Sequence, residues 1–206
     1  SCEPHVVIAA MTTSSATPAP SVRTIRFIQV EWRFLLFGMI MAFWSSLGQT
    51  FFISLFADDI RAALSLTHGD FGTYYAIATT ASAISLLWLG KLADTVRLEK
   101  LALLILASLC SGAIFFSQIN SIIMLVFGLY FLRMFGQGMM THVYSTAMAR
   151  RYVAARGRAI SIAQLGHTIS ESVGPAGVVA LHALFDWRTI WIILPTTALI
   201  LVMPFL

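Results

Sequence analysis

The sequence predicts an all-α membrane protein with six transmembrane helices. Of the 206 residues, 58% are hydrophobic and only 11% are charged, whereas a soluble domain has about 25% charged residues. The charges are too few to cover a water-facing surface, so lipid must surround most of the chain. The basic residues lie in short clusters between apolar segments, as in membrane loops. That pattern argues against nucleic acid as the partner of the net charge of +4.

Six apolar segments meet the length of roughly 20 residues that a spanning helix needs. In chain order, the predicted spans are residues 33–57, 71–92, 98–118, 121–149, 157–184 and 187–206. Their connections are short except for residues 58–70, whose charged ends indicate a polar loop. We therefore expect a disordered cytoplasmic tail over residues 1–32 and a six-helix transmembrane domain over residues 33–206.

The N-terminal tail does not have the pattern of a signal peptide. The tail is rich in Ser, Thr, Ala and Pro from Thr12 to Ser21, and it lacks the charged and apolar regions of a signal peptide. Met11 is a candidate start, and the chain stops at Leu206 inside an apolar segment, as a truncated chain would. The two cysteines, Cys2 and Cys110, lie far apart, so we predict no disulfide framework and no metal site.

The basic residues predict the orientation of the spans, because cytoplasmic loops carry an excess of Lys and Arg. Of the 13 basic residues, only Arg61 and Arg188 fall on one side, and Arg133 lies within a span. The other side holds Arg23, Arg26, Arg33, Lys91, Arg97, Lys100, Arg150, Arg151, Arg156 and Arg158. The N-terminus and the loops after spans two and four are therefore predicted to be cytoplasmic.

Two charged residues lie deep within the predicted spans. Arg133 in span four and Glu171 in span five each stand about thirteen residues, or roughly 18–20 Å, from the outer end of their helix. A charge at this depth costs a few kcal/mol and usually indicates function or a buried partner. We hypothesise that Arg133 and Glu171 form an ion pair or reach one substrate from two sides. The alternative is that Arg133 only locks helices together.

Other polar residues accompany these charges. His167 lies one turn before Glu171, so it could relay a proton or simply pack between helices. Gln49 in span one and Gln137 in span four either line a cavity or join helices. Each follows a glycine, and this Gly-Gln match is a weak sign of an inverted three-plus-three repeat.

A glycine- and proline-containing motif lies in span five. Gly174, Pro175 and Gly177 are predicted to interrupt and bend this helix, because proline removes a backbone hydrogen bond. The bend is either a pivot or part of the shape of the bundle.

Several of these motifs resemble the major facilitator superfamily of transporters. Gly90 and Asp94 match the start of that family's cytoplasmic signature after span two, although the basic end of the signature differs. In the family, the glycine allows close helix packing and the aspartate joins a charge network. Arg133-Met134-Phe135-Gly136 resembles the arginine motif of the family's fourth helix, which is linked to proton coupling.

Spans five and six carry the rest of the resemblance. Gly166, Gly174-Pro175 and Gly177 are similar to the antiporter signature, and Asp186-Trp187-Arg188 resembles the start of the family's sixth helix. The resemblance implies the N-terminal six-helix half of a twelve-helix transporter, with the C-terminal half missing. It also implies transport of a small molecule by alternating access across the cytoplasmic membrane, without a cofactor.

Two other classes of function compete with transport. The chain lacks the Gly-x-Ser-x-Gly and His-Glu-x-x-His motifs of hydrolases, so an intramembrane enzyme is disfavoured and no catalytic residue is predicted. A membrane sensor or assembly factor remains open. Arg133, Glu171 and His167 favour a proton-coupled transporter. The identity of the substrate does not follow from the sequence.

Overall fold

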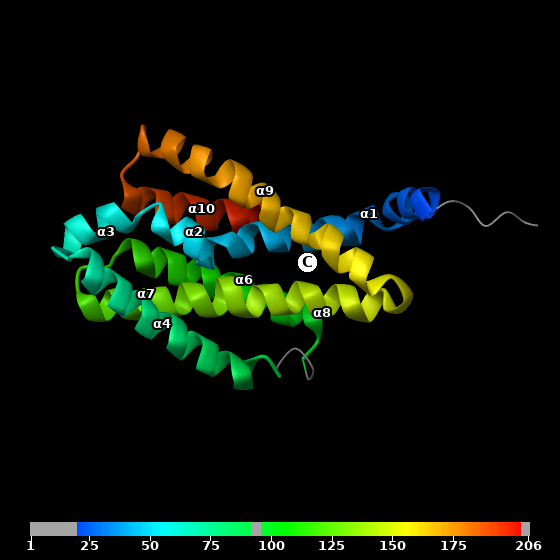
Figure 1. Ribbon diagram of the computed structural model, residues 1–206, viewed down its shortest axis with the longest axis horizontal. Helices are drawn as coiled ribbons and strands as arrows, with labels where there is room; N and C mark the ends of the chain where they lie inside the picture. The colour runs from blue at the N-terminus through cyan, green and yellow to red at the C-terminus, as the bar shows by residue number, and fades with distance from the viewer. Residues whose placement is uncertain (1–19, 92–95, 203–206) are drawn as a thin grey trace, which may run out of the picture. The chain divides into compact units, whose positions relative to one another are not determined.

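The computed structural model describes residues 20–91 and 96–202, and these are helical apart from short turns (Figure 1). The chain forms two compact units, Ser1–Trp32 and Arg33–Leu206. The first unit contributes the start of helix α1 (Pro20–Ser45), and the second contains every other element. Of the predicted disordered tail, residues 1–19 lie outside the described residues, whereas residues 20–32 are helical and form the start of α1.

The first predicted span is a broken helix. Helix α1 ends at Ser45 and continues as a 3₁₀ turn, η1 (Ser46–Gly48), before α2 (Thr50–Ser54). Gln49 between them is extended, with φ −85° and ψ 152°. The hydroxyl of Ser45 donates to the carbonyl of Ala42 at 2.7 Å, a backbone contact that weakens helices. The prediction of one helix over residues 33–57 is therefore wrong.

The connection after this span is also more ordered than predicted. Residues 58–70 are not a simple loop, because α3 (Ala57–Leu64) is helical and is followed by Ser65 in the left-handed conformation, with φ 54°. Helix α4 (His68–Leu89) then begins with a capping box. In this box, the hydroxyl of Thr67 accepts from the backbone N–H of Asp70, and the backbone N–H of Thr67 donates to the Asp70 carboxylate.

The remaining helices follow the predicted spans closely. Helix α6 covers Leu98–Ser117, and the fourth span consists of α7 (Ile122–Phe131), a π-helix η2 (Leu132–Met140) and α8 (Thr141–Arg151). After the 3₁₀ turn η3 (Val153–Ala155) come α9 (Arg156–His182) and α10 (Trp187–Val202). Helix α9 remains helical through Pro175, so the prediction that its motif interrupts the helix is wrong.

Aromatic rings join the end of the first span to the end of the third and the start of the sixth. Trp191 of α10 is fully buried, and its ring centroid lies 4.8 Å from that of Phe116 on α6. The rings of Phe52 and Phe56 lie 5.8 Å and 5.2 Å from the same indole. Edge-to-face and tilted pairs at these distances add to the stabilisation from burial. The part of the first span that follows the break is thereby anchored to α6 and α10.

Arg188 fixes the junction between α6 and α10. Its guanidinium donates to the carbonyls of Ser117 at 2.7 Å and Ile119 at 2.9 Å, and it lies over the ring of Trp187. The last carbonyls of a helix have no partner within the helix. A positive charge at this end is also favoured by the helix dipole. Arg188 therefore caps the C-terminal end of α6.

Three stretches of the described residues are long and apolar enough to cross a membrane. They are Ile25–Gly48, Leu98–Ser117 and Ile122–Arg151, and Trp187–Val202 is a shorter apolar helix. Helices α4 and α9 are 22 and 27 residues long, which is sufficient length, but they are richer in polar residues. Length and composition thus support three of the six predicted spans directly.

Candidate functional site

The broken first span crosses the π-helix of the fourth span at two glycines. A Cβ on Gly136 would lie 2.7 Å from both the N and the Cα of Gly48, and a Cβ on Gly48 would overlap the carbonyl oxygen of Leu132. Only glycine allows two backbones to approach this closely. These two glycines precede Gln49 and Gln137, the residues of the predicted repeat. Both helices depart from α geometry at this crossing, and π segments often occur at functional sites.

Arg133 lies beside the crossing and binds the broken helix. It is 8% exposed. Its Nη1 donates to the carbonyl of Gly48 at 3.3 Å and to the hydroxyl of Thr50 at 3.0 Å. A backbone carbonyl released from a helix inside the membrane needs another donor. Arg133 supplies one, so it does join helices. Its buried Nε–H has no hydrogen-bond partner among the described residues.

Two residues that the sequence did not single out complete this cluster. Tyr75 of α4 donates a hydrogen bond to the hydroxyl of Thr50 at 2.8 Å, and its ring lies 5.3 Å from the Arg133 guanidinium carbon. This distance is within the range of a cation–π contact. Thr50 therefore links Arg133 and Tyr75, joining spans one, two and four. A tyrosine inside an apolar span was the available signal, but the sequence does not show which face it occupies.

A second polar cluster joins spans one and five. Nδ1 of His167 lies 3.2 Å from the hydroxyl of Ser46, and its Nε2 lies 3.4 Å from Oε1 of Glu171. Phe51 covers the imidazole edge-on, with the ring centroids 6.0 Å apart. Half of the Glu171 side chain is exposed, whereas that of His167 is 29% exposed. The predicted His-Glu pair is thus in contact, and Ser46 connects it to the 3₁₀ turn of the first span.

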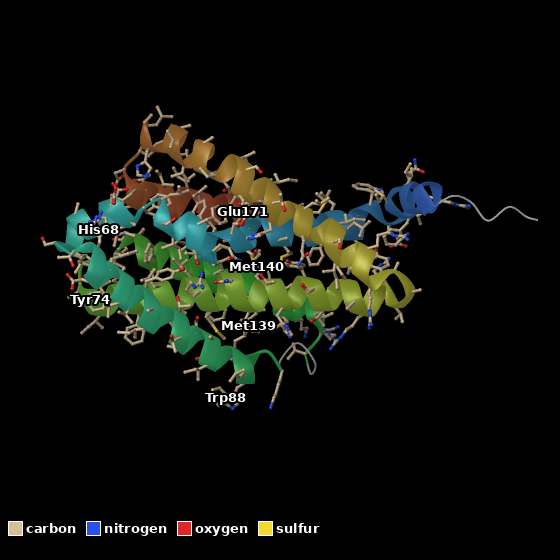
Figure 2. The ribbon with its side chains drawn as sticks, viewed as in Figure 1. His68, Tyr74, Trp88, Met139, Met140 and Glu171 are labelled. Atoms are coloured by element: carbon tan, nitrogen blue, oxygen red, sulfur yellow. The ribbon has the colours of Figure 1, made fainter. Side chains whose placement is uncertain are left out.

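The structure does not join Arg133 to Glu171. No ion pair between them occurs in the described part of the chain, since Arg133 binds Gly48 and Thr50 while Glu171 faces His167. The predicted direct pair is therefore wrong. Figure 2 shows Glu171 at a level along the helices similar to that of Met140, the last residue of the π-helix. The depth argument places the two charges at comparable levels, but it cannot decide which helix faces they occupy.

The other predicted site residues occupy defined positions. Gln49 is the extended residue of the break, and the backbone nitrogen of Gln137 lies against Gly48. Gly174 and Gly177 line a pocket beside the first span. A Cβ on Gly90 would lie 2.8 Å from the carbonyl oxygen of Leu86 in its own helix and 3.9 Å from Nε2 of His142 across the helices, so the space is tight within α4 rather than at a helix crossing. Asp94 lies outside the described residues.

Comparison with known proteins gives one match. The family model described as Major Facilitator Superfamily matches residues 35–206, which is most of the chain. Neither a curated protein nor a solved structure matches the sequence or the fold.

Proposed function

The chain belongs to the major facilitator superfamily, and from this membership we propose that it moves a small solute across the cytoplasmic membrane by alternating access, coupled to protons. It is a multi-pass membrane protein of the transporter type, and the family typically comprises transporters rather than enzymes. Membership also implies a small-solute substrate. These points favour transport over a sensor, an assembly factor or an intramembrane enzyme.

We place residues 33–206 as the N-terminal half of the transporter, with six spans in an inverted three-plus-three repeat and a cytoplasmic N-terminus. The contact between Gly48 and Gly136 supports this repeat, because equivalent helices one and four would meet at its axis. The second six-helix half would be the partner that completes the path.

The observation that carries the proposal is the polar connection through the break in the first span. Ser46, on one side of the break, contacts the His167–Glu171 pair, and Thr50, on the other side, contacts Arg133. The break frees the backbone to change conformation, and it is tied to two ionisable clusters on different helices. Protonation of the His167–Glu171 pair would change its contact with the turn at Ser46 and thereby bias the break.

Proton flux measured in lipid vesicles tests this proposal. The full protein would be reconstituted in vesicles that contain the pH dye pyranine, and the lumen pH would be followed while amines, organic acids and sugars are added. Glu171→Gln should reduce solute-driven proton flux by about tenfold or more, because it removes the group that accepts the proton. Arg133→Gln should also reduce it, since Gln cannot donate to Gly48 and Thr50 with a charged group.

Glu99→Gln is the matched control, because Glu99 is an exposed acid in the first turn of α6, at the predicted cytoplasmic end. It should leave the flux near the wild-type value. Wild-type flux in both Glu171→Gln and Arg133→Gln would refute the assignment of the coupling residues. A folded protein that moves neither protons nor any solute of the panel would contradict the transport function itself.

A further inference from the structure

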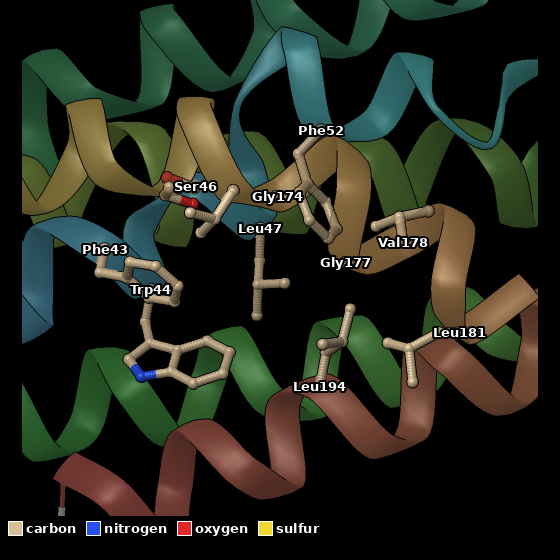
Figure 3. A pocket seen from close by; sticks show the side chains of 12 residues that line it. Phe43, Trp44, Ser46, Leu47, Phe52, Gly174, Gly177, Val178, Leu181 and Leu194 are labelled. Carbon is tan, nitrogen blue, oxygen red and sulfur yellow. The ribbon is translucent and has the colours of Figure 1, made fainter.

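The strongest unassigned feature is a partly open apolar pocket between the first span, α9 and α10 (Figure 3). Its volume is about 160 Å³, and its walls come from the first span, α9 and α10. Trp44, Leu47 and Phe52 form one wall, and Val173, Val178 and Leu194 contribute to the others. A cavity of about 150 Å³ with apolar walls remains dry and holds one benzene ring. This pocket therefore has the size and chemistry for a single ring or a short branched alkyl group.

The glycines of α9 help to create this space. Gly174 and Gly177 both line the pocket, and a Cβ on Gly177 would meet no atom within 4 Å. Most other glycines of the spans differ, because a Cβ on Gly48, Gly136 or Gly166 would collide with backbone atoms. Gly177 is thus not required for helix packing in this unit. Its lack of a side chain leaves room in the pocket.

The pocket has a polar edge on the side of the ionisable pair. Ser46 is one of the lining residues, and its hydroxyl lies 3.2 Å from Nδ1 of His167, whose Nε2 lies 3.4 Å from Oε1 of Glu171. Glu171 is the acidic residue that lies deep within a predicted span, whereas Glu99 lies at the start of span three. A carboxylate accepts hydrogen bonds, so it favours a ligand group that donates them. The occupant is therefore a molecule with an apolar group at one end and a donor at the other.

A second apolar recess adjoins the pocket. It shares Phe43 and Trp44 with the first, has a volume of about 270 Å³, and is lined further along by Met39, Ile40 and Ile169. Helix α10 packs mainly on α6 and makes few contacts with α9. An apolar ligand dissolved in the bilayer thus has an apolar surface next to the pocket.

We propose that this pocket is a subsite for the apolar group of an amphipathic solute, the size of one ring, whose donor group faces His167 and Glu171. The inference rests on the proposed transport function, to which it adds a substrate class. Arg133 plays no part in it, because its guanidinium binds Gly48 and Thr50.

Fluorescence quenching by a brominated probe tests the subsite. The probe is 4-bromobenzylamine, which carries one ring and one amine, and bromine quenches a tryptophan only at short range. The full protein in lipid nanodiscs should show saturable quenching that Trp44→Phe removes, because Trp44 lines the pocket. Gly177→Val should weaken binding about tenfold, which corresponds to 1.4 kcal/mol. Glu171→Gln should weaken probe binding by a smaller factor, because it affects only the contact with the amine of the probe.

Gly157→Val is the matched control, since it is the same substitution in the same helix at a glycine whose Cβ would also meet no atom. It should leave binding unchanged, and equal melting temperatures of the two variants would show that both fold. Unchanged quenching in Gly177→Val would overturn the proposal. Quenching by brominated lipid chains that the probe does not displace would also overturn it, because a lipid tail would then fill the pocket.

The vesicle assay separates the two proposals. If the probe binds as expected but no solute drives proton flux, the transport function fails and the pocket remains a ligand site. If solutes drive proton flux equally in wild type and Gly177→Val, and quenching is also equal, the subsite fails and the transport function stands.

Discussion

The crossing of Gly48 and Gly136 leads to a prediction about stability. In Gly136→Ala the new methyl carbon would lie 2.7 Å from two backbone atoms of Gly48 and 3.1 Å from the carbonyl oxygen of Ser45. Backbone atoms cannot rotate away as a side chain can, so the first and fourth spans must separate. Such overpacking typically costs about 1–3 kcal/mol.

Gly138→Ala is the matched control, because it makes the same change in the same π-helix. Its methyl would lie 3.3 Å and 3.4 Å from the two terminal carbons of Leu86, which can shift. Both substitutions gain the helix propensity of alanine, about 1 kcal/mol, so this gain cancels in the comparison. The difference between the variants therefore isolates the steric cost of the crossing.

The measurement is unfolding of the purified protein in detergent micelles. We expect Gly136→Ala to be less stable than Gly138→Ala by about 1–3 kcal/mol. For a protein of this size, that difference corresponds to a melting temperature lower by roughly 3–10 °C. A Gly136→Ala variant at least as stable as Gly138→Ala would refute the close crossing.

Two further predictions concern helix ends. Arg188→Gln should lower the free energy of unfolding by about 1.5–3 kcal/mol, because it removes charged hydrogen bonds to the carbonyls of Ser117 and Ile119. Thermal unfolding measures this loss, and an unchanged melting temperature would argue against the helix cap. At the start of α4, hydrogen bonds from the hydroxyl and backbone of Thr67 hold the pKa of Asp70 below its ordinary value. Since the folded pKa is the lower one, the stabilisation is present above the unfolded pKa of about 3.9 and is lost as the pH falls through the folded pKa. Wild type should therefore lose more stability than Asp70→Asn on acidification from about pH 5 to pH 3, and parallel losses would contradict the capping box.

The π-helix and the break in the first span are two features that the sequence did not predict. The apolar length predicts that residues 121–149 and 33–57 are helical, and most of them are. The local irregularity depends on a partner: Gly48 and Gly136 touch across helices, and Arg133 then satisfies the released carbonyl of Gly48. A propensity argument treats each segment alone, so it could not find a break that a second helix stabilises.

Some contacts of the candidate site could be predicted from the sequence, and others could not. His167 and Glu171 are one turn apart on one helix, so their contact follows from the helical repeat. The pairing of Arg133 with Glu171 needed two helices to present particular faces to each other, and that prediction was wrong. Thr50 and Tyr75 were missed for the same reason, because their hydrogen bond joins residues 25 positions apart.

Sequence alone determined the all-helical membrane class, because the membrane requires long apolar segments that satisfy their own backbone hydrogen bonds, and short motifs in those segments and their loops indicated the family. These constraints act within one segment and are therefore visible in composition and spacing. Tertiary structure alone decided which partners Arg133 binds, where the first helix breaks, and that Gly177 borders an open pocket. Those features depend on the rotation and separation of neighbouring helices, and a linear pattern records neither.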